Sequence, residues 1–214
     1  YWDDAIPSQS AYRVEKTVTG EDMGLDRLSD PSDPLYISDD APAKLSDAKD
    51  LFYDQDNDTF WVCDSGNNRI LRLDTDLKVT GCYTGFTGST EISVGEDGRS
   101  TFLNPNGIYV KKSIFDDKLY VYIADTDNSR AVKCTVESGT EMTLVQEYTK
   151  PDTKLYDSET FNPSKILADK AENIYVVCKS VNTGSVQFNK DGEFQGFYGA
   201  NRVEVTAAVI AQKL

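Results

Sequence analysis

Three stretches of the sequence repeat one order of apolar and polar positions. Each has a short apolar segment, a polar turn, a second segment rich in β-branched and aromatic residues, another turn, and two further apolar segments. Val, Ile, Tyr, Phe and Trp fit the pleated, half-buried surface of a β-sheet. The repeats begin at Ala48, Pro105 and Pro163. The pattern therefore predicts three units, each with four antiparallel strands.

The polar turns between the predicted strands favour tight reversals. One of them contains Asp191-Gly192, and Asp-Gly favours a hairpin because the central residues of the turn need positive φ. Repeated four-stranded antiparallel units are the blades of a β-propeller. A β-sandwich, the rival all-β fold, does not require similarity between such units. The predicted fold class is therefore all-β, a β-propeller with about three four-stranded blades in this chain.

A nine-residue segment between the second and third predicted strands is the best-matched part of the repeat. It reads VCDSGNNRI over Val62–Ile70 and IADTDNSRA over Ile123–Ala131. Asp and Asn side chains accept or donate hydrogen bonds within turns, and Arg can return to a carboxylate. In the third unit Lys179 stands where the Asp is expected. We expect six residues to stabilise their own turns rather than a ligand: Asp64, Asn67, Arg69, Asp125, Asn128 and Arg130.

This segment resembles the signature of the NHL repeat, V-A-D-S-G-N-N-R-I. The Tyr1-Trp2 start, Thr19–Gly24 and Gly196–Val203 are also similar to segments of bacterial extracellular NHL proteins described as gluconolactonase-like. The resemblance implies an NHL-type β-propeller in a bacterial protein that is extracellular or located at the cell surface. It does not imply a particular ligand.

A propeller closes with about four to eight blades, so three blades predict part of a ring, and we expect a six-bladed one. The predicted organisation has an N-terminal extension with a ring-closing strand, then blade 1 with a long connection, blade 2, a degenerate blade 3, and the start of a helix or a connection. These parts cover residues 1–47, 48–104, 105–162, 163–200 and 201–214.

Three ways of closing the ring remain open at this stage. The chain is the first half of a longer protein, or two copies form a six-bladed homodimer, or residues 1–47 hide a further blade. We favour the first, because residues 12–18 alternate like a strand that completes a last blade. The segment 205–214 also lacks Gly and Pro and starts like a helix.

Charge narrows the classes of partner. The chain has 36 acidic and 22 basic residues and a formal net charge of −14, which repels nucleic acid and anionic membrane surfaces. No apolar run is long enough to span a bilayer. The sequence has no histidine, which removes the commonest general base. We therefore expect a non-catalytic scaffold that binds a protein, a peptide or a glycan.

The four cysteines do not form a Cys-x-x-Cys pair. Cys63 and Cys178 align with Ala124 at the end of the second strand, and we expect them to be buried thiols. Cys82 and Cys134 lie on outer strands of adjacent units, where a disulfide remains open.

Channel-facing positions are the predicted ligand site. Asp50, Asn106 and Lys165 stand where the first strand of each unit begins, and this strand lines the central channel of a propeller. Asn201 and Arg202 follow the third unit and are predicted to approach the same mouth. We expect these five residues to bind a ligand, not to catalyse a reaction.

The alternative function is a calcium-dependent, gluconolactonase-like hydrolase, which the resemblance implies would hold its metal with Glu, Asn and Asp. Glu15, Asn106 and Asp169 are available by type. A second acidic segment, Asp54–Asp58, has the spacing of a calcium loop but lacks its Gly and Glu, so we expect a hairpin turn there. No cofactor is expected outside the calcium alternative.

Overall fold

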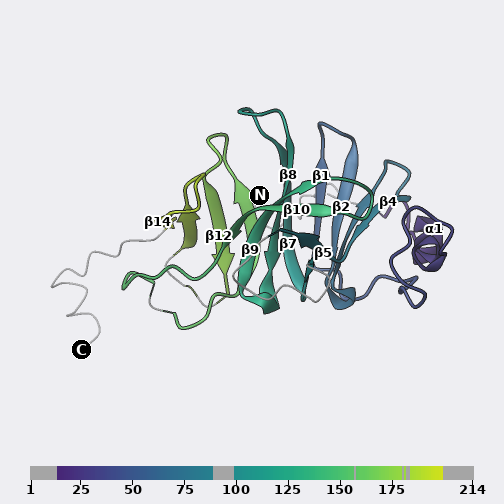
Figure 1. Cartoon of the computed structure of the whole chain (residues 1–214), viewed down its shortest axis with the longest axis horizontal. Coiled ribbons are helices and arrows are strands. Elements are labelled where there is room, and N and C mark those ends of the chain that lie inside the picture. Colours follow the sequence, from purple (N-terminus) through teal and green to yellow (C-terminus); the bar gives the residue numbers. More distant parts are fainter. Residues whose placement is uncertain (1–13, 89–98, 157, 180, 182–183, 200–214) are drawn as a thin grey trace, which may run out of the picture.

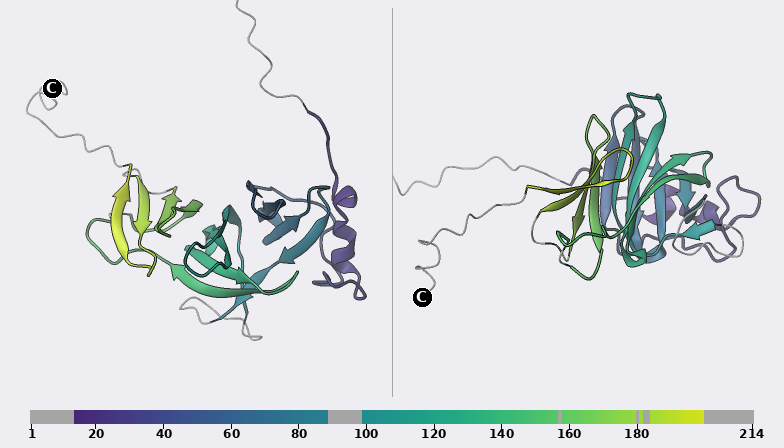
Figure 2. Two further views of the ribbon diagram at one scale, coloured as in Figure 1. Left: turned by 90° about the horizontal axis from the view of Figure 1, so that it is seen from above. Right: turned by 60° about the vertical axis from the view of Figure 1, so that its left-hand side comes forward.

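The computed structural model describes residues 14–88, 99–156, 158–179, 181 and 184–199. The regular structure in these ranges is nearly all β-strand and forms three mainly antiparallel sheets (Figure 1). Each sheet contains one predicted four-stranded unit, and Figure 2 shows the sheets following one another along an arc. The predicted all-β propeller fold is confirmed, with three consecutive blades in this chain.

The strands of each blade run in chain order from the inner to the outer edge. Blade 1 contains β1 (Asp50–Asp54), β2 (Thr59–Asp64), β3 (Arg69–Leu73) and β4 (Val79–Tyr83). Blade 2 contains β7 (Pro105–Lys112), β8 (Leu119–Asp125), β9 (Arg130–Val136) and β10 (Met142–Tyr148). Blade 3 contains β11 (Pro163–Ala168), β12 (Ile174–Cys178), β13 (Ser185–Phe188) and β14 (Phe194–Tyr198).

Helical structure in the described residues is limited to four short elements. Two precede blade 1, α1 (Gly20–Met23) and η1 (Leu25–Ser29), and two are 3-10 turns in the repeated motif, η2 (Ser65–Asn67) and η3 (Thr126–Asn128). Among the described residues no helix has the length and apolar character needed to cross a bilayer.

Strand pairing gives the true correspondence between blades. Asp50 pairs with Cys63, Gly107 with Ala124, and Lys165 with Val177. Asp50, Gly107 and Lys165 are therefore equivalent, one on each inner strand.

The same pairing corrects the sequence alignment of the third unit. Cys178 pairs with Pro163 as Asp125 pairs with Pro105. Cys178, not Lys179, thus occupies the position of the motif aspartate, and it is not equivalent to Cys63. The alignment was displaced by one residue because the third unit has no Asp–Arg pair to serve as a landmark.

Each blade has a leading face, toward the preceding blade, and a trailing face, toward the following blade. The trailing faces of blades 1 and 2 meet the leading faces of blades 2 and 3 in two apolar cores. Full burial of one large apolar side chain stabilises a fold by roughly 1.5–3 kcal/mol, so these junctions hold the arc together. The first core includes Trp61, Ile70, Tyr83, Ile108, Val121 and Ile123. The second includes Tyr122, Ala131, Tyr148, Ile166, Ile174 and Val176.

The N-terminal segment covers part of the leading face of blade 1. Met23, Leu25 and Leu28 of α1 and η1 pack in one core with Leu71 and Leu73 of β3. A ring-closing strand was expected over residues 12–18. Residues 14–18 are not in a strand, and Tyr12 and Arg13 lie outside the described residues.

Connecting segments also pack between the outer strands of adjacent blades. The connection expected to be only long and polar contains β5 (Gly85–Thr87) and β6 (Arg99–Thr101), which extend the sheet of blade 2 beyond β10. Phe86 and Phe102 from this connection join the core between blades 1 and 2. Tyr156 and Phe161 join the core between blades 2 and 3.

Candidate functional site

The repeated turn motif of blade 1 forms a buried hydrogen-bond network around Asp64. Asp64 is fully buried. Its Oδ1 accepts from the backbone N–H of Ser46 at 2.7 Å, and its Oδ2 accepts from Asn67 Nδ2 at 2.9 Å and Arg69 Nε at 2.7 Å. Asn67 also donates to the Lys44 carbonyl at 2.8 Å. The motif thus joins the blade to the segment that precedes it.

Blade 2 repeats this network. Asp125 accepts from the Leu103 backbone at 2.8 Å and from Asn128 and Arg130 at 2.8 Å each, and Asn128 donates to the Thr101 carbonyl at 2.9 Å. The carboxylates and guanidiniums of both motifs are almost fully buried. These six side chains are occupied within the protein rather than presented to a ligand.

A hydroxyl after each motif aspartate also contacts the next blade. Ser65 Oγ donates to the Pro105 carbonyl, and Thr126 Oγ1 donates to the Pro163 carbonyl at 2.6 Å. Pro105 and Pro163 are the first residues of the inner strands β7 and β11. Each motif therefore fixes the start of the following inner strand.

The inner strands β1, β7 and β11 begin on the same side of the arc, which is called the mouth below. At the mouth, Asp50 of blade 1 contacts both blade 2 and blade 3. Its Oδ2 accepts from the backbone N–H of Ile108 in β7 at 2.9 Å, and its Oδ1 forms an ion pair with Lys165 Nζ of β11. The Asp50 side chain is 16% exposed and that of Lys165 is 52% exposed. The structure thus brings together two residues that the sequence predicted for the mouth, and leaves the Lys165 ammonium accessible to solvent.

Asn106 is the extra residue of a β-bulge. The pairing of β7 with β8 shifts register between Pro105 and Gly107, which leaves Asn106 unpaired in the ladder. Bulges re-aim a side chain and are common beside functional sites. Asn106 is 4% exposed, and its Oδ1 has no hydrogen-bond partner among the described residues. A buried acceptor without a partner is costly, and a ligand could donate to it only after a local movement exposes the Asn106 amide.

The equivalent bulge in blade 3 falls at Ser164, whose hydroxyl donates to the Val177 carbonyl at 3.0 Å. Asn106 and Ser164 therefore belong to one set of positions, and Asp50 and Lys165 belong to the neighbouring set. The sequence prediction grouped Asn106 with Asp50 and Lys165. Their true equivalent in blade 2 is Gly107, which has no side chain to suggest a site residue.

Gly107 permits the close approach of β7 and β11. A Cβ at this position would lie 2.7 Å from the Ser164 carbonyl oxygen and 2.8 Å from Lys165 Cα, far inside van der Waals contact. The absence of a side chain lets the inner strands pack closely, so that Lys165 reaches Asp50 across blade 2. A glycine at this position, where the other two units have Asp50 and Lys165, was the signal available in the sequence.

The remaining expected site residues do not join this cluster. Asn201 and Arg202 lie outside the described residues. Asp169 lies at the opposite end of β11 from Lys165, in the turn before β12, and accepts from Asn173 and Tyr175.

The residues suggested for calcium are not gathered into a site among the described residues. Glu15 is exposed, and Asn106 and Asp169 lie at opposite ends of adjacent inner strands. The Asp54–Asp58 segment is a hairpin turn between β1 and β2, where Asp54 accepts from Asn57 Nδ2 at 2.8 Å. No group of three His, Cys, Asp or Glu residues in the described part of the chain is arranged to hold a metal ion.

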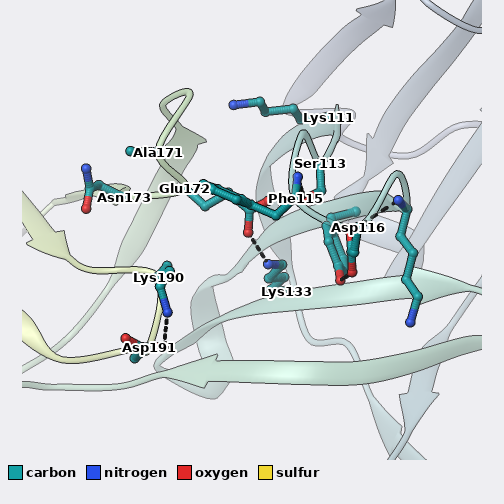
Figure 3. Close-up of polar contacts among 12 residues, drawn as sticks. Lys111, Ser113, Phe115, Asp116, Lys133, Ala171, Glu172, Asn173, Lys190 and Asp191 are labelled. Carbon is teal, nitrogen blue, oxygen red and sulfur yellow. Dashed lines mark hydrogen bonds and ion pairs between the residues drawn. The ribbon is translucent and has the colours of Figure 1, made fainter.

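A second polar cluster lies between blades 2 and 3, near the turns that follow β7 and β11 (Figure 3). Asp50 lies where the inner strands begin, at the other end of these strands. Lys133 Nζ is 2.7 Å from Glu172 Oε2, and the same ammonium lies 3.8 Å from the centre of the Tyr120 ring. Burial alone raises the pKa of Glu172, but hydrogen bonds from Lys133 and Ser113 lower it below its ordinary value. Both side chains are 8% exposed, so this pair is a contact between blades rather than a ligand site.

The four cysteines are free and buried. The disulfide left open between Cys82 and Cys134 is not formed in this structure. Burial raises the pKa of the Cys82 and Cys178 thiols to about 12. These thiols are therefore inert core residues at neutral pH.

No protein-family model matches this chain, and no curated protein matches it. Solved structures similar to it include hydrazine synthase from Kuenenia stuttgartiensis, at a TM-score of 0.47 and 13% identity over 77% of this chain and 40% of that chain. A gluconolactonase-like protein has a TM-score of 0.44 and 12% identity, over 73% of this chain and 50% of that chain. Streptogramin B lyase has a TM-score of 0.35 and 14% identity, over 69% of this chain and 53% of that chain.

This chain therefore spans about half or less of the length of these three structures. Likenesses at these TM-scores bear on neither its activity nor its ligand.

Proposed function

We propose that this chain belongs to an NHL-type, six-bladed propeller of a bacterium that acts outside the cell or at its surface as a binding scaffold. The ligand in this proposal is a peptide or a glycan bound at the mouth where β1, β7 and β11 begin. The near-complete VCDSGNNRI segment and its hydrogen-bonded turn support the NHL assignment.

The observation that carries the proposal is the Asp50–Lys165 pair with its half-exposed lysine, at the strand starts that also hold Asn106 and its unpartnered Oδ1. An amide acceptor requires an N–H or O–H donor. Peptide amides and sugar hydroxyls both supply such donors, and the half-exposed Lys165 ammonium can donate to their carbonyl or hydroxyl oxygens. The net charge of −14 argues against nucleic acid as the ligand.

A peptide and glycan array screened with the folded chain tests the proposal. Titration calorimetry of each hit would then compare the unaltered chain with Asn106→Ala and Lys165→Met. Loss of one hydrogen bond to a ligand costs about 1.4 kcal/mol, or roughly tenfold in affinity. Lys190→Met is the matched control, because Lys190 forms an exposed ion pair with Asp191 in a turn at the other end of the blade.

We expect tenfold weaker binding for both mouth variants and unchanged binding for the control. A screen without a specific ligand, or ligands that bind the Asn106 variant as tightly as the unaltered chain, would overturn the proposal.

A further inference from the structure

The two partners of the Asp50–Lys165 ion pair differ in how easily a ligand can reach them. The Asp50 side chain is 16% exposed, and both of its oxygens are engaged, one by Lys165 Nζ and the other by the backbone N–H of Ile108 at 2.9 Å. The Lys165 side chain is 52% exposed. A group that arrives from solvent therefore meets the ammonium first, and the charge that it must complement is positive.

A second lysine lies at the same end of blade 3. Lys179 follows β12 and is exposed, and its backbone N–H donates to the Asn162 carbonyl at 3.0 Å, next to the start of β11. Strand pairing places Lys179 at the position of Ser65 and Thr126 in the other blades. Blade 3 thus adds positive charge at the mouth where blades 1 and 2 have a neutral hydroxyl.

A change of partner at Lys165 costs little. An ion pair with an exposed lysine stabilises a protein weakly, because solvent screens the charges and the long side chain loses entropy when it is held. When Lys165 turns to another carboxylate, Asp50 keeps the N–H of Ile108. Distant acidic residues oppose an incoming anion only weakly at physiological salt, where the Debye length is about 8 Å.

The present partner of Lys165 indicates which anion fits. The ammonium is held by a carboxylate on the short stem of an aspartate, so an acidic side chain is the group whose fit this structure already demonstrates. A phosphate group carries more negative charge than a carboxylate. A chain with a net charge of −14 therefore opposes a phosphate more strongly.

We propose that the ligand of the mouth is an acidic peptide, and that one of its Asp or Glu carboxylates replaces Asp50 on the Lys165 ammonium. This inference rests on the proposed function and narrows its ligand. Asp50 is an internal competitor that holds Lys165 in place when no ligand is bound. Lys179 attracts a second acidic side chain of the same peptide.

NMR titration of the isotope-labelled chain with a blocked tri-aspartate peptide, at physiological ionic strength, tests this inference. The Ile108 amide is the reporter, because it donates to Asp50. A blocked tri-asparagine peptide has nearly the same shape without the charge, and an oligogalacturonate carries its carboxylates on a sugar. Asp191→Asn and Lys190→Met are the matched control variants, because each breaks an exposed ion pair in the turn between β13 and β14.

We expect the tri-aspartate peptide to bind Asp50→Asn about threefold more tightly than the unaltered chain, because the competitor is lost. Lys165→Met should bind it about tenfold more weakly. Both control variants should bind it as the unaltered chain does, and the tri-asparagine peptide should not bind. Circular dichroism checks that each variant is folded.

Equal or weaker binding to Asp50→Asn, or equal binding of the tri-asparagine peptide, would contradict the inference. Tighter binding of the oligogalacturonate than of the peptide would also contradict it and assign the carboxylate to a glycan. Array ligands that are uncharged yet depend on Lys165 would overturn this inference and leave the proposed function standing. An array without any ligand for the mouth would instead overturn the proposed function, and this inference with it.

Discussion

Lys133 of β9 and Glu172 of the turn before β12 form an ion pair buried between blades 2 and 3, with 2.7 Å between Nζ and Oε2. Removing one partner of a buried pair leaves an uncompensated charge and typically costs 3–5 kcal/mol. We expect Lys133→Met to lower the free energy of unfolding by about 3 kcal/mol, measured by urea denaturation. Lys190→Met, which breaks an exposed pair, should change it little. Equal effects would contradict a role for this pair in joining the blades.

The same pair gives a dependence on pH. Hydrogen bonds from Lys133 and Ser113 outweigh burial and hold the pKa of Glu172 below its ordinary value of 4.5. A carboxyl with a lowered folded-state pKa stabilises the fold above the unfolded-state pKa, and the stabilisation is lost as pH falls through the folded-state pKa. The difference between the unaltered chain and Lys133→Met should therefore be largest near neutral pH and shrink below pH 4.5. A difference that stays constant down to strongly acidic pH would contradict this assignment.

Asp125→Asn tests the repeated turn motif. The substitution keeps the side-chain shape but removes the charge that faces the buried Arg130. We expect a loss of about 3 kcal/mol in the free energy of unfolding. Asp47→Asn, in an exposed pair with Lys49, is the control and should leave the midpoint unchanged. If both variants have the same unfolding midpoint, the motif does not stabilise its turn.

Gly107→Ala tests the close approach of β7 and β11. The added methyl group would meet backbone atoms of Ser164 and Lys165, which cannot move aside as a side chain can. Overpacking of this kind costs roughly 1–3 kcal/mol. Gly139→Ala is the control, because its Cβ would lie 2.6 Å from the end of the Leu35 side chain and no closer than 3.4 Å to a backbone atom, the Thr80 carbonyl oxygen. A Gly107 variant as stable as its control would show that the inner strands can separate.

Thiol reactivity tests the state of the cysteines. All four are buried and free, and burial raises each pKa above its ordinary value of 9.0. We expect no rapid reaction with a thiol reagent at pH 8 in the folded chain, and four reactive thiols after unfolding without reductant. Two reactive thiols after unfolding would instead show that a disulfide had formed.

Calcium distinguishes the scaffold from the calcium-dependent hydrolase. A ligand that binds only the folded state raises its melting temperature by mass action. Because Asn106 and Asp169 lie at opposite ends of adjacent strands, we expect millimolar calcium to leave the melting temperature unchanged in differential scanning calorimetry. A rise of several degrees, together with opening of lactones, would favour the hydrolase.

The strands were predictable because each unit repeats short runs of β-branched and aromatic residues separated by polar turns. The Asp–Asn–Arg turns were predictable because their hydrogen bonds are local in sequence. Asp50 and Lys165 could be assigned to one mouth from their places in the repeat, although their direct contact spans blade 2 and depends on Gly107. The packing of α1 and η1 on blade 1 had no such signal, because it depends on long-range burial of Met23, Leu25 and Leu28.

The one-residue error in aligning the third unit shows which information the sequence lacked. With Cys178 in place of the motif aspartate and no arginine opposite, no polar pair marks the register, and only the backbone ladder does. The bulges at Asn106 and Ser164 are likewise changes of backbone register that leave no trace in composition.

The hydroxyl contacts from Ser65 to Pro105 and from Thr126 to Pro163 recur at the same place in the two repeats. Each one ties the end of a second strand to the backbone where the next inner strand begins. A substitution that removes one hydroxyl would therefore weaken one joint and leave the other intact.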